Sequence, residues 1–158
     1  MSYDVVSLIP GFCEIFCGNG NFEDGGMVYW DQIDLSTYDY SVASLMQVDR
    51  YLYAVCDAKD GLKRQTYTNM VLATGAYVGE VLRRNSERDW VWMNYDQFVE
   101  AFPTLPDATG LTEDLNTAAV LVGDGKEVVL PFNKIMRFLE EGPENSTLAF
   151  FEAFAGVR

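Results

Sequence analysis

The sequence predicts a single α+β domain in which an antiparallel sheet packs against a helical hairpin and two short C-terminal helices. Apolar residues recur at helical spacing over residues 35–85, which indicates amphipathic helices. Short segments of β-branched and aromatic residues, joined by glycine-containing turns, occupy residues 90–131 and predict strands. Proline and glycine delimit helical segments over residues 132–155. The chain has 158 residues, 49% of them hydrophobic, so one core and one domain over residues 1–158 are expected.

The first segment, residues 1–34, is expected to form a β-hairpin-like structure. Stretches 12–17 and 27–30 are short, apolar and aromatic, which favours strands. The connection 18–26 is rich in glycine and is typical of a turn. It lacks the lysine and the spacing of a phosphate-binding loop, and its acidic residues would repel a phosphate. A hairpin loop is therefore the better interpretation.

Two helices are expected over residues 35–85. The first begins near Asp34 or Ser36, either of which could cap it, and ends before the Asp-Gly pair at 60–61. The second covers about 63–85. Because the connection between them is short, the two helices are expected to form an antiparallel hairpin.

Two glycines, Gly75 and Gly79, lie about one turn apart in the second helix. Each costs about 1 kcal/mol of helix stability relative to alanine. Their presence predicts that a strand or another helix approaches the backbone closely at this face. A ligand lying against the bare backbone is the alternative.

The sheet is expected within residues 90–131. Stretch 90–95 predicts a strand with large side chains on both faces, so both faces should be covered. The clearest hairpin has strands at 118–122 and 127–130 around a Gly-Asp-Gly turn. Residues 96–116 contain two prolines and are expected to form a long irregular excursion.

Two short helices are expected over residues 132–155. Pro131 immediately precedes the first helix, at 132–141, and the Gly-Pro pair that follows ends it. The second helix, at about 145–154, carries apolar residues toward the core.

An ordered series of motifs carries a resemblance to a known group of proteins. It comprises the Gly-Glu helix at 75–85, the Trp-Val strand at 90–91, the Gly-Asp-Gly hairpin, and the Pro-Phe helix within 130–142. The series resembles small bacterial domains of unknown function, some of which are immunity-protein-like and occur beside toxin genes. It covers about residues 65–142, and its motifs are structural. The resemblance therefore implies the α+β fold more than any activity. It points to toxin immunity through those of the domains that look like immunity proteins, and it carries over no catalytic residue.

The charge balance is strongly acidic, with 24 Asp and Glu against 11 Lys and Arg and a net charge of −13. This field repels nucleic acids and anionic membrane surfaces, so neither is an expected partner. It attracts a basic protein partner, although solubility alone would also explain it.

The expected location is cytoplasmic. No apolar run reaches the length of a membrane span, and the start lacks the pattern of a signal peptide. Three sparse cysteines, Cys13, Cys17 and Cys56, suit a reducing compartment and are expected to be ordinary core or near-core thiols.

No catalytic residue, cofactor or metal site is predicted, and the protein is not expected to be an enzyme. The absence of histidine removes histidine bases, histidine-ligated metals and the common nucleophile pairs. Glu80 and Asp49 are expected to lie roughly 12 Å apart along the helical hairpin, too far to share a proton. Glu80 should accept hydrogen bonds from backbone amides, a tyrosine or the Trp90 indole. Asp49 should pair with Arg50 or Lys63, or be solvated.

The predicted partner-binding site consists of Glu23, Asp24, Trp30, Asp31 and Asp34. Clustered acids raise the association rate with a basic protein, and an exposed aromatic anchor slows dissociation. The alternative is that Trp30 is buried in an additional strand and the acids only solvate the loop.

Three functions are compatible with these observations. The first is a non-enzymatic acidic binding protein for a basic protein partner, with toxin immunity as its most concrete form. The second is a structural or assembly subunit of a phage-like or secretion particle. The third is a small-ligand-binding protein or an enzyme that uses carboxylates and tyrosines, which would need a deep pocket containing Glu80, a tyrosine and a second carboxylate.

Overall fold

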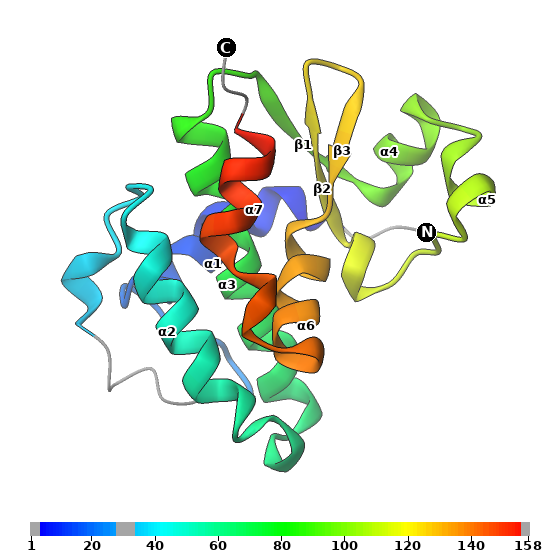
Figure 1. Cartoon of the computed structure of the whole chain (residues 1–158). Helices are drawn as coiled ribbons and strands as arrows, with labels where there is room; N and C mark the ends of the chain where they lie inside the picture. The colour runs from blue at the N-terminus through cyan, green and yellow to red at the C-terminus, as the bar shows by residue number, and fades with distance from the viewer. Residues whose placement is uncertain (1–3, 28–33, 156–158) are drawn as a thin grey trace.

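The computed structural model describes residues 4–27 and 34–155 (Figure 1). Within these ranges the chain forms seven α-helices and one three-stranded antiparallel sheet, which confirms the predicted α+β class. The elements, in chain order, are α1 (Ile9–Phe16), α2 (Ser44–Cys56), α3 (Arg64–Asn85), β1 (Trp90–Asn94), α4 (Tyr95–Ala101), α5 (Leu105–Thr109), β2 (Ala119–Gly123), β3 (Glu127–Val129), α6 (Pro131–Glu141) and α7 (Thr147–Phe154).

Helix α3 is the central element of the main core. Every residue from 73 to 82 is buried, because α1 and α6 pack along it and β1 and α7 also contact it. α2 and α3 follow one another through a short 3₁₀ turn (Lys59–Gly61), but each has other main partners. α2 packs chiefly against α6 and α7, at the front of the molecule in Figure 1.

Two close approaches occur at the glycines of α3, as predicted. A β-carbon at Gly75 would overlap the ring of Phe132 at the start of α6, and one at Gly79 would overlap the indole of Trp92 on β1. Gly75 therefore allows α6, and Gly79 allows β1, to lie directly against the α3 backbone.

The sheet is the middle layer of the molecule, with strand order β1-β2-β3. The register aligns Trp92, Leu121 and Val129 on the face that joins the main core around α3 and α6. On the opposite face, Val120 and Val122 form a second core with Phe98 of α4. Helices α4 and α5 form a lobe on that side of the sheet (Figure 1), so helices lie on both faces as expected, although Val91 of β1 is still 55% exposed.

The N-terminal segment is not a β-hairpin over its described residues. Residues 9–16 form α1, whose buried residues Ile9, Cys13 and Phe16 follow the helical period rather than the alternation of a strand. Pro10 lies in its first turn, where the missing backbone N–H is not needed. The second expected strand, at 27–30, lies almost entirely outside the described residues.

The first helix of the expected hairpin begins later than predicted. Asp34 does act as an N-cap, but only of a 3₁₀ turn (Leu35–Thr37), where its carboxylate accepts the Ser36 N–H. Tyr40 then adopts a positive φ of 66°, a conformation incompatible with a continuing helix, and α2 starts at Ser44.

The prediction of a long irregular segment at 96–116 is also wrong, because this segment contains most of α4 and all of α5. Asn94 and Gln97 form a capping box that starts α4, and Pro106 lies in the first turn of α5. Gly110, with φ of 74°, ends α5. The prolines here initiate or follow helices, whereas the sequence prediction treated them only as breakers.

The remaining C-terminal elements agree with the prediction. The β2–β3 hairpin turns through Asp124 and Gly125, α6 has Pro131 at its start, and Gly142 ends it with φ of 112°. No helix in the part of the chain described here combines the length and the apolar character needed to cross a bilayer.

Candidate functional site

The predicted partner-binding residues are only partly described. Glu23, Asp24 and Asp34 are exposed, whereas Trp30 and Asp31 lie outside the described residues. Hydrogen bonds from the Ser36 hydroxyl and N–H lower the pKa of Asp34. Its carboxylate is therefore ionised near neutral pH, with part of its hydrogen-bonding capacity used by the 3₁₀ turn.

The loop at 18–27 is fixed in place by the first turns of α3. Buried Asn69 donates from Nδ2 to the carbonyls of Asp24 (2.6 Å) and Gly26 (3.1 Å). Thr66 Oγ1 donates to the carbonyl of Gly25 (2.5 Å). Gly25 has φ of 82°, and a β-carbon there would meet α3 at about 3 Å, so no other residue type fits easily.

This arrangement presents Glu23 and Asp24 outward from a rigid support. Both side chains are exposed. The ion pairs among the described residues involve other acids, on α3, β3 and α6. The two carboxylates are thus available to a partner.

An apolar cavity of about 550 Å³ lies next to this loop, between α1, α3 and the 3₁₀ helix η5 (Leu115–Thr117). Glu113 and Asp114 also line it, and both are exposed. Its apolar lining comprises Val5, Leu8, Phe12, Leu72, Leu115 and Ala118.

The cavity and the acidic loop are contiguous. The rings of Phe12, in the cavity, and Phe22, in the loop, have centroids 5.9 Å apart. On α3, Thr68 lines the cavity, and the adjacent Asn69 holds the loop. Carboxylates therefore lie both in the lining of the hollow, at Glu113 and Asp114, and in the loop next to it, at Glu23 and Asp24. We call the cavity, together with these four acidic residues, the acid-flanked surface.

The sequence predicted only the acidic loop of this surface. Phe12 was expected in a strand and residues 113–115 in an irregular segment. Two signals point to the rest of the surface. Leu8 and Phe12 are four residues apart, as on one helix face, and Asp114 with Thr117 has the spacing of a capping box, which the structure contains.

Glu80 is a structural carboxylate in a buried position. It accepts hydrogen bonds from Trp92 Nε1 (2.9 Å) and from Arg83 Nε and Nη2 (2.6 and 2.9 Å). Burial raises the pKa of Glu80, but the hydrogen bonds from Arg83 and Trp92 outweigh it, so the net pKa lies below its ordinary value. An indole donor was predicted, but the tryptophan is Trp92. Trp90 donates instead to Ser86 Oγ (3.0 Å).

Asp49 neither pairs with a base nor is simply solvated, so this prediction is wrong. Its carboxylate accepts hydrogen bonds from the Thr147 N–H (2.7 Å), the Thr147 hydroxyl (2.6 Å) and the Ser146 hydroxyl (2.6 Å). Asp49 on α2 therefore caps the N-terminus of α7, where a negative charge is favourable.

The buried tyrosine and cysteine side chains remain protonated. Burial raises the pKa of Tyr77 to about 12, and its hydroxyl accepts the Tyr40 N–H (3.0 Å) and shares a hydrogen bond with Ser44 Oγ (2.7 Å). Burial likewise raises the pKa of Cys13 to about 12. Tyr77 and Glu80 have no hydrogen-bond partner in common, so these hydrogen bonds do not join the tyrosine and the carboxylate in one network.

No group of three or more cysteine, aspartate and glutamate side chains placed to hold one metal ion occurs within residues 4–27 and 34–155. Comparison of the chain with protein-family models, with curated proteins and with solved structures gave no match. The resemblance over residues 65–142 therefore remains an expectation from the sequence.

Proposed function

We propose that this protein is a non-enzymatic binding protein that holds a basic protein partner on the acid-flanked surface. The observation that carries the proposal is the apolar cavity with a rigidly supported pair of carboxylates beside it. Because hydrogen bonds from Asn69 already order the loop, binding would cost little of the loop's conformational entropy.

The chemistry of the surface defines the partner segment. A net charge of −13 accelerates association with a basic protein, and the carboxylates beside the cavity orient it. A cavity lined by Leu8, Phe12 and Leu72 accepts an apolar side chain, which slows dissociation. An amphipathic basic helix, which presents apolar anchors between positive charges, combines both features.

Toxin immunity is the most concrete form of this function, and it rests on the resemblance over residues 65–142. We expect the protein to act in the cytoplasm, since Cys13, Cys17 and Cys56 are all free thiols and suit a reducing compartment.

A model peptide tests the proposal. The probe is an amphipathic helix of lysine and leucine, and the comparison peptides are its scrambled form and a form with glutamate in place of lysine. Association and dissociation rates are measured at several salt concentrations. The variants are Leu8→Glu, which changes the cavity, and the double variant Glu23→Lys/Asp24→Lys, which changes the loop.

Matched control variants introduce the same charges elsewhere. Met46→Glu on α2 replaces a side chain exposed like Leu8 (51% and 53%), and Glu100→Lys/Asp107→Lys alters the α4–α5 lobe. We expect the loop variant to lower the association rate about tenfold and Leu8→Glu to raise the dissociation rate, while both controls bind like the parent. Equal losses in variants and controls would mean that only net charge attracts the peptide, and the proposal would fail.

A further inference from the structure

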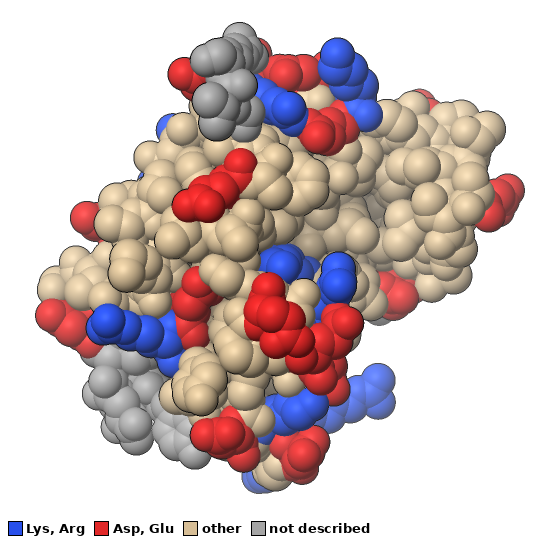
Figure 2. Space-filling model, viewed as in Figure 1, with Lys and Arg blue, Asp and Glu red and all other residues tan. Residues whose placement is uncertain are grey.

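A second hollow, of about 360 Å³, lies between β3, α6 and α7. Its walls are apolar, with Val128 and Leu130 on the β3 side and Phe150 and Phe154 on α7. Figure 2 shows a largely uncharged depression beside α7, with basic side chains at its lower end. The basic residues that line this hollow are Lys134 and Arg137 of α6.

Lys134 is a half-buried cation without a fixed partner. Its ammonium group makes no hydrogen bond or ion pair with any described residue. Burial lowers the pKa of Lys134 and the charge of Arg137 adds to this effect, whereas Asp49 and Glu141 oppose it. The Asp49 carboxylate is already engaged by the N-terminus of α7.

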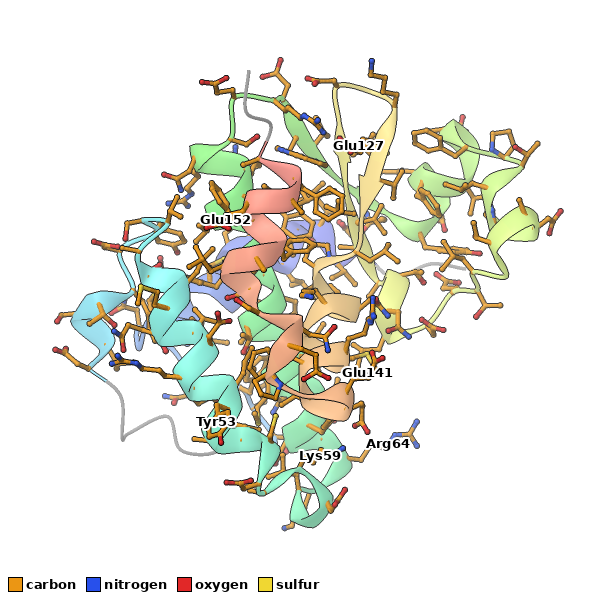
Figure 3. The ribbon with its side chains drawn as sticks, viewed as in Figure 1. Tyr53, Lys59, Arg64, Glu127, Glu141 and Glu152 are labelled. Atoms are coloured by element: carbon orange, nitrogen blue, oxygen red, sulfur yellow. The ribbon has the colours of Figure 1, made fainter. Side chains whose placement is uncertain are left out.

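The acidic residues around the hollow leave Lys134 without an ion pair. Glu127 pairs with Arg88, and Glu141 pairs with Arg137 Nε at 2.8 Å, so Glu141 offsets the charge of Arg137. Glu152 lies on the side of α7 away from β3 (Figure 3). Among the described residues that line the hollow, Lys134 is therefore an unpaired cation beside apolar walls, in a chain whose net charge is −13.

We propose that this hollow binds a small monocarboxylate with an apolar tail, whose carboxylate contacts Lys134 and Arg137 and whose tail lies along Phe150 and Phe154. Its volume falls at the lower end of the roughly 300–1,000 Å³ of ligand pockets. The Arg137–Glu141 pair is half exposed and contributes little, so the guanidinium can turn part of its donor set to a ligand. A phosphate ion fits less well, because its larger negative charge is repelled by the acidic protein and because it would make no contact with the apolar walls.

Octanoate is the probe, titrated by calorimetry into the intact protein, with octanol and octylamine as matched compounds. Lys134→Met removes the ammonium group but keeps an unbranched apolar side chain that extends to the ε position. Lys126→Met, in the exposed β2–β3 turn, is the control for the same change in net charge. Ala153→Phe tests the apolar wall, because Ala153 is exposed and lines the hollow, so the larger side chain fills it without disturbing the core.

We expect the parent and Lys126→Met to bind octanoate alike, Lys134→Met to bind it at least tenfold more weakly, and Ala153→Phe to bind it weakly or not at all. Octanol should bind the parent and Lys134→Met equally, and octylamine should bind neither. The proposal fails if octanoate does not bind the parent, if octanol binds as tightly as octanoate, or if Lys134→Met binds octanoate like the parent. These outcomes are separate from those at the acid-flanked surface, which shares no lining residue with this hollow.

Discussion

At the residue scale, Glu80 shows how a buried charge is retained in this fold. Removing its carboxylate from water is unfavourable, and the donors on Trp92 and Arg83 compensate for that cost. The indole comes from β1 and the guanidinium from the next turn of α3. Glu80 therefore links the sheet to the central helix through hydrogen bonds.

Glu80→Gln is expected to lower the free energy of unfolding by roughly 1.5–3 kcal/mol near neutral pH, because charged hydrogen bonds become neutral ones. The folded-state pKa lies below the ordinary value of 4.5, so the carboxylate stabilises the fold above that pH. This contribution is lost as the pH falls through the folded-state pKa. Urea unfolding should therefore show a difference between parent and variant that shrinks in acid.

The exposed residue Glu100, on α4, provides the control. Glu100→Gln should change unfolding little at any pH, since surface substitutions have small effects. A Glu80→Gln difference that stays constant from neutral to acidic pH would contradict the ionised, hydrogen-bonded carboxylate described above.

At the element scale, the position of α6 depends on the bare backbone of α3. Phe132 is fully buried in the first turn of α6, and its ring occupies the space that a side chain at position 75 would need. Its backbone is also close, since its Cα would lie 3.2 Å from an added β-carbon. The ring cannot move away without displacing the helix that carries it.

Gly75→Ala is therefore expected to destabilise the protein by about 1–3 kcal/mol through overpacking, even though alanine is the better helix former. Gly61→Ala is the control, because nothing lies within 4 Å of the added β-carbon there. Thermal unfolding followed by circular dichroism measures both. If Gly75→Ala melts at or above the parent temperature, α6 does not pack against the backbone as described.

The elements with a long or regular sequence pattern were predicted most accurately, and short irregular ones least. α3, the β2–β3 hairpin and α6 have clear periods and boundary residues, and all three were predicted close to their observed bounds. α1 has only eight residues, and its apolar and aromatic character suits a strand as well as a helix. Local pattern could not distinguish the two, because the burial of Phe16 depends on its contact with Tyr77 of α3.

The candidate site was less predictable, because it depends on contacts between distant parts of the chain. Asn69 fixes the loop more than forty residues before it, and Asp49 caps a helix that starts 98 residues later. A sequence pattern reports neighbours along the chain, whereas these partners meet only after folding. Composition predicted the acidic character of the surface, but not the cavity beside it.

At the scale of the whole molecule, the sheet separates two cores of unequal size. The main core surrounds α3 and includes residues from every helix except α4 and α5. The second core has three buried residues, Phe98, Val120 and Val122, and holds the α4–α5 lobe to the sheet (Figure 1). The lobe thus buries far less apolar surface than the rest of the protein.

Amide hydrogen exchange should reveal this difference. We expect amides of α4 and α5 to exchange through a partial opening, with a smaller free energy and a weaker urea dependence than amides in the buried middle of α3. The amides of β2 should follow those of α3, since both faces of that strand are covered. Equal free energies and urea dependences in α4 and α3 would show that the lobe unfolds only with the whole domain.

The packing of α2 has a consequence for how the protein is made. Its main partners, α6 and α7, lie within residues 131–154, and the carboxylate of Asp49 accepts hydrogen bonds from Ser146 and Thr147 at the start of α7. While the ribosome is still translating the intervening residues, the apolar face of α2 lacks its main native partners, although Tyr51 can already contact Phe16 of α1. Contacts of such long sequence separation delay folding and leave apolar surface open to chaperones and to other nascent chains. We therefore expect the domain to fold late, in one step that follows synthesis of α7, and the α2 face to be the surface that a chaperone protects until then.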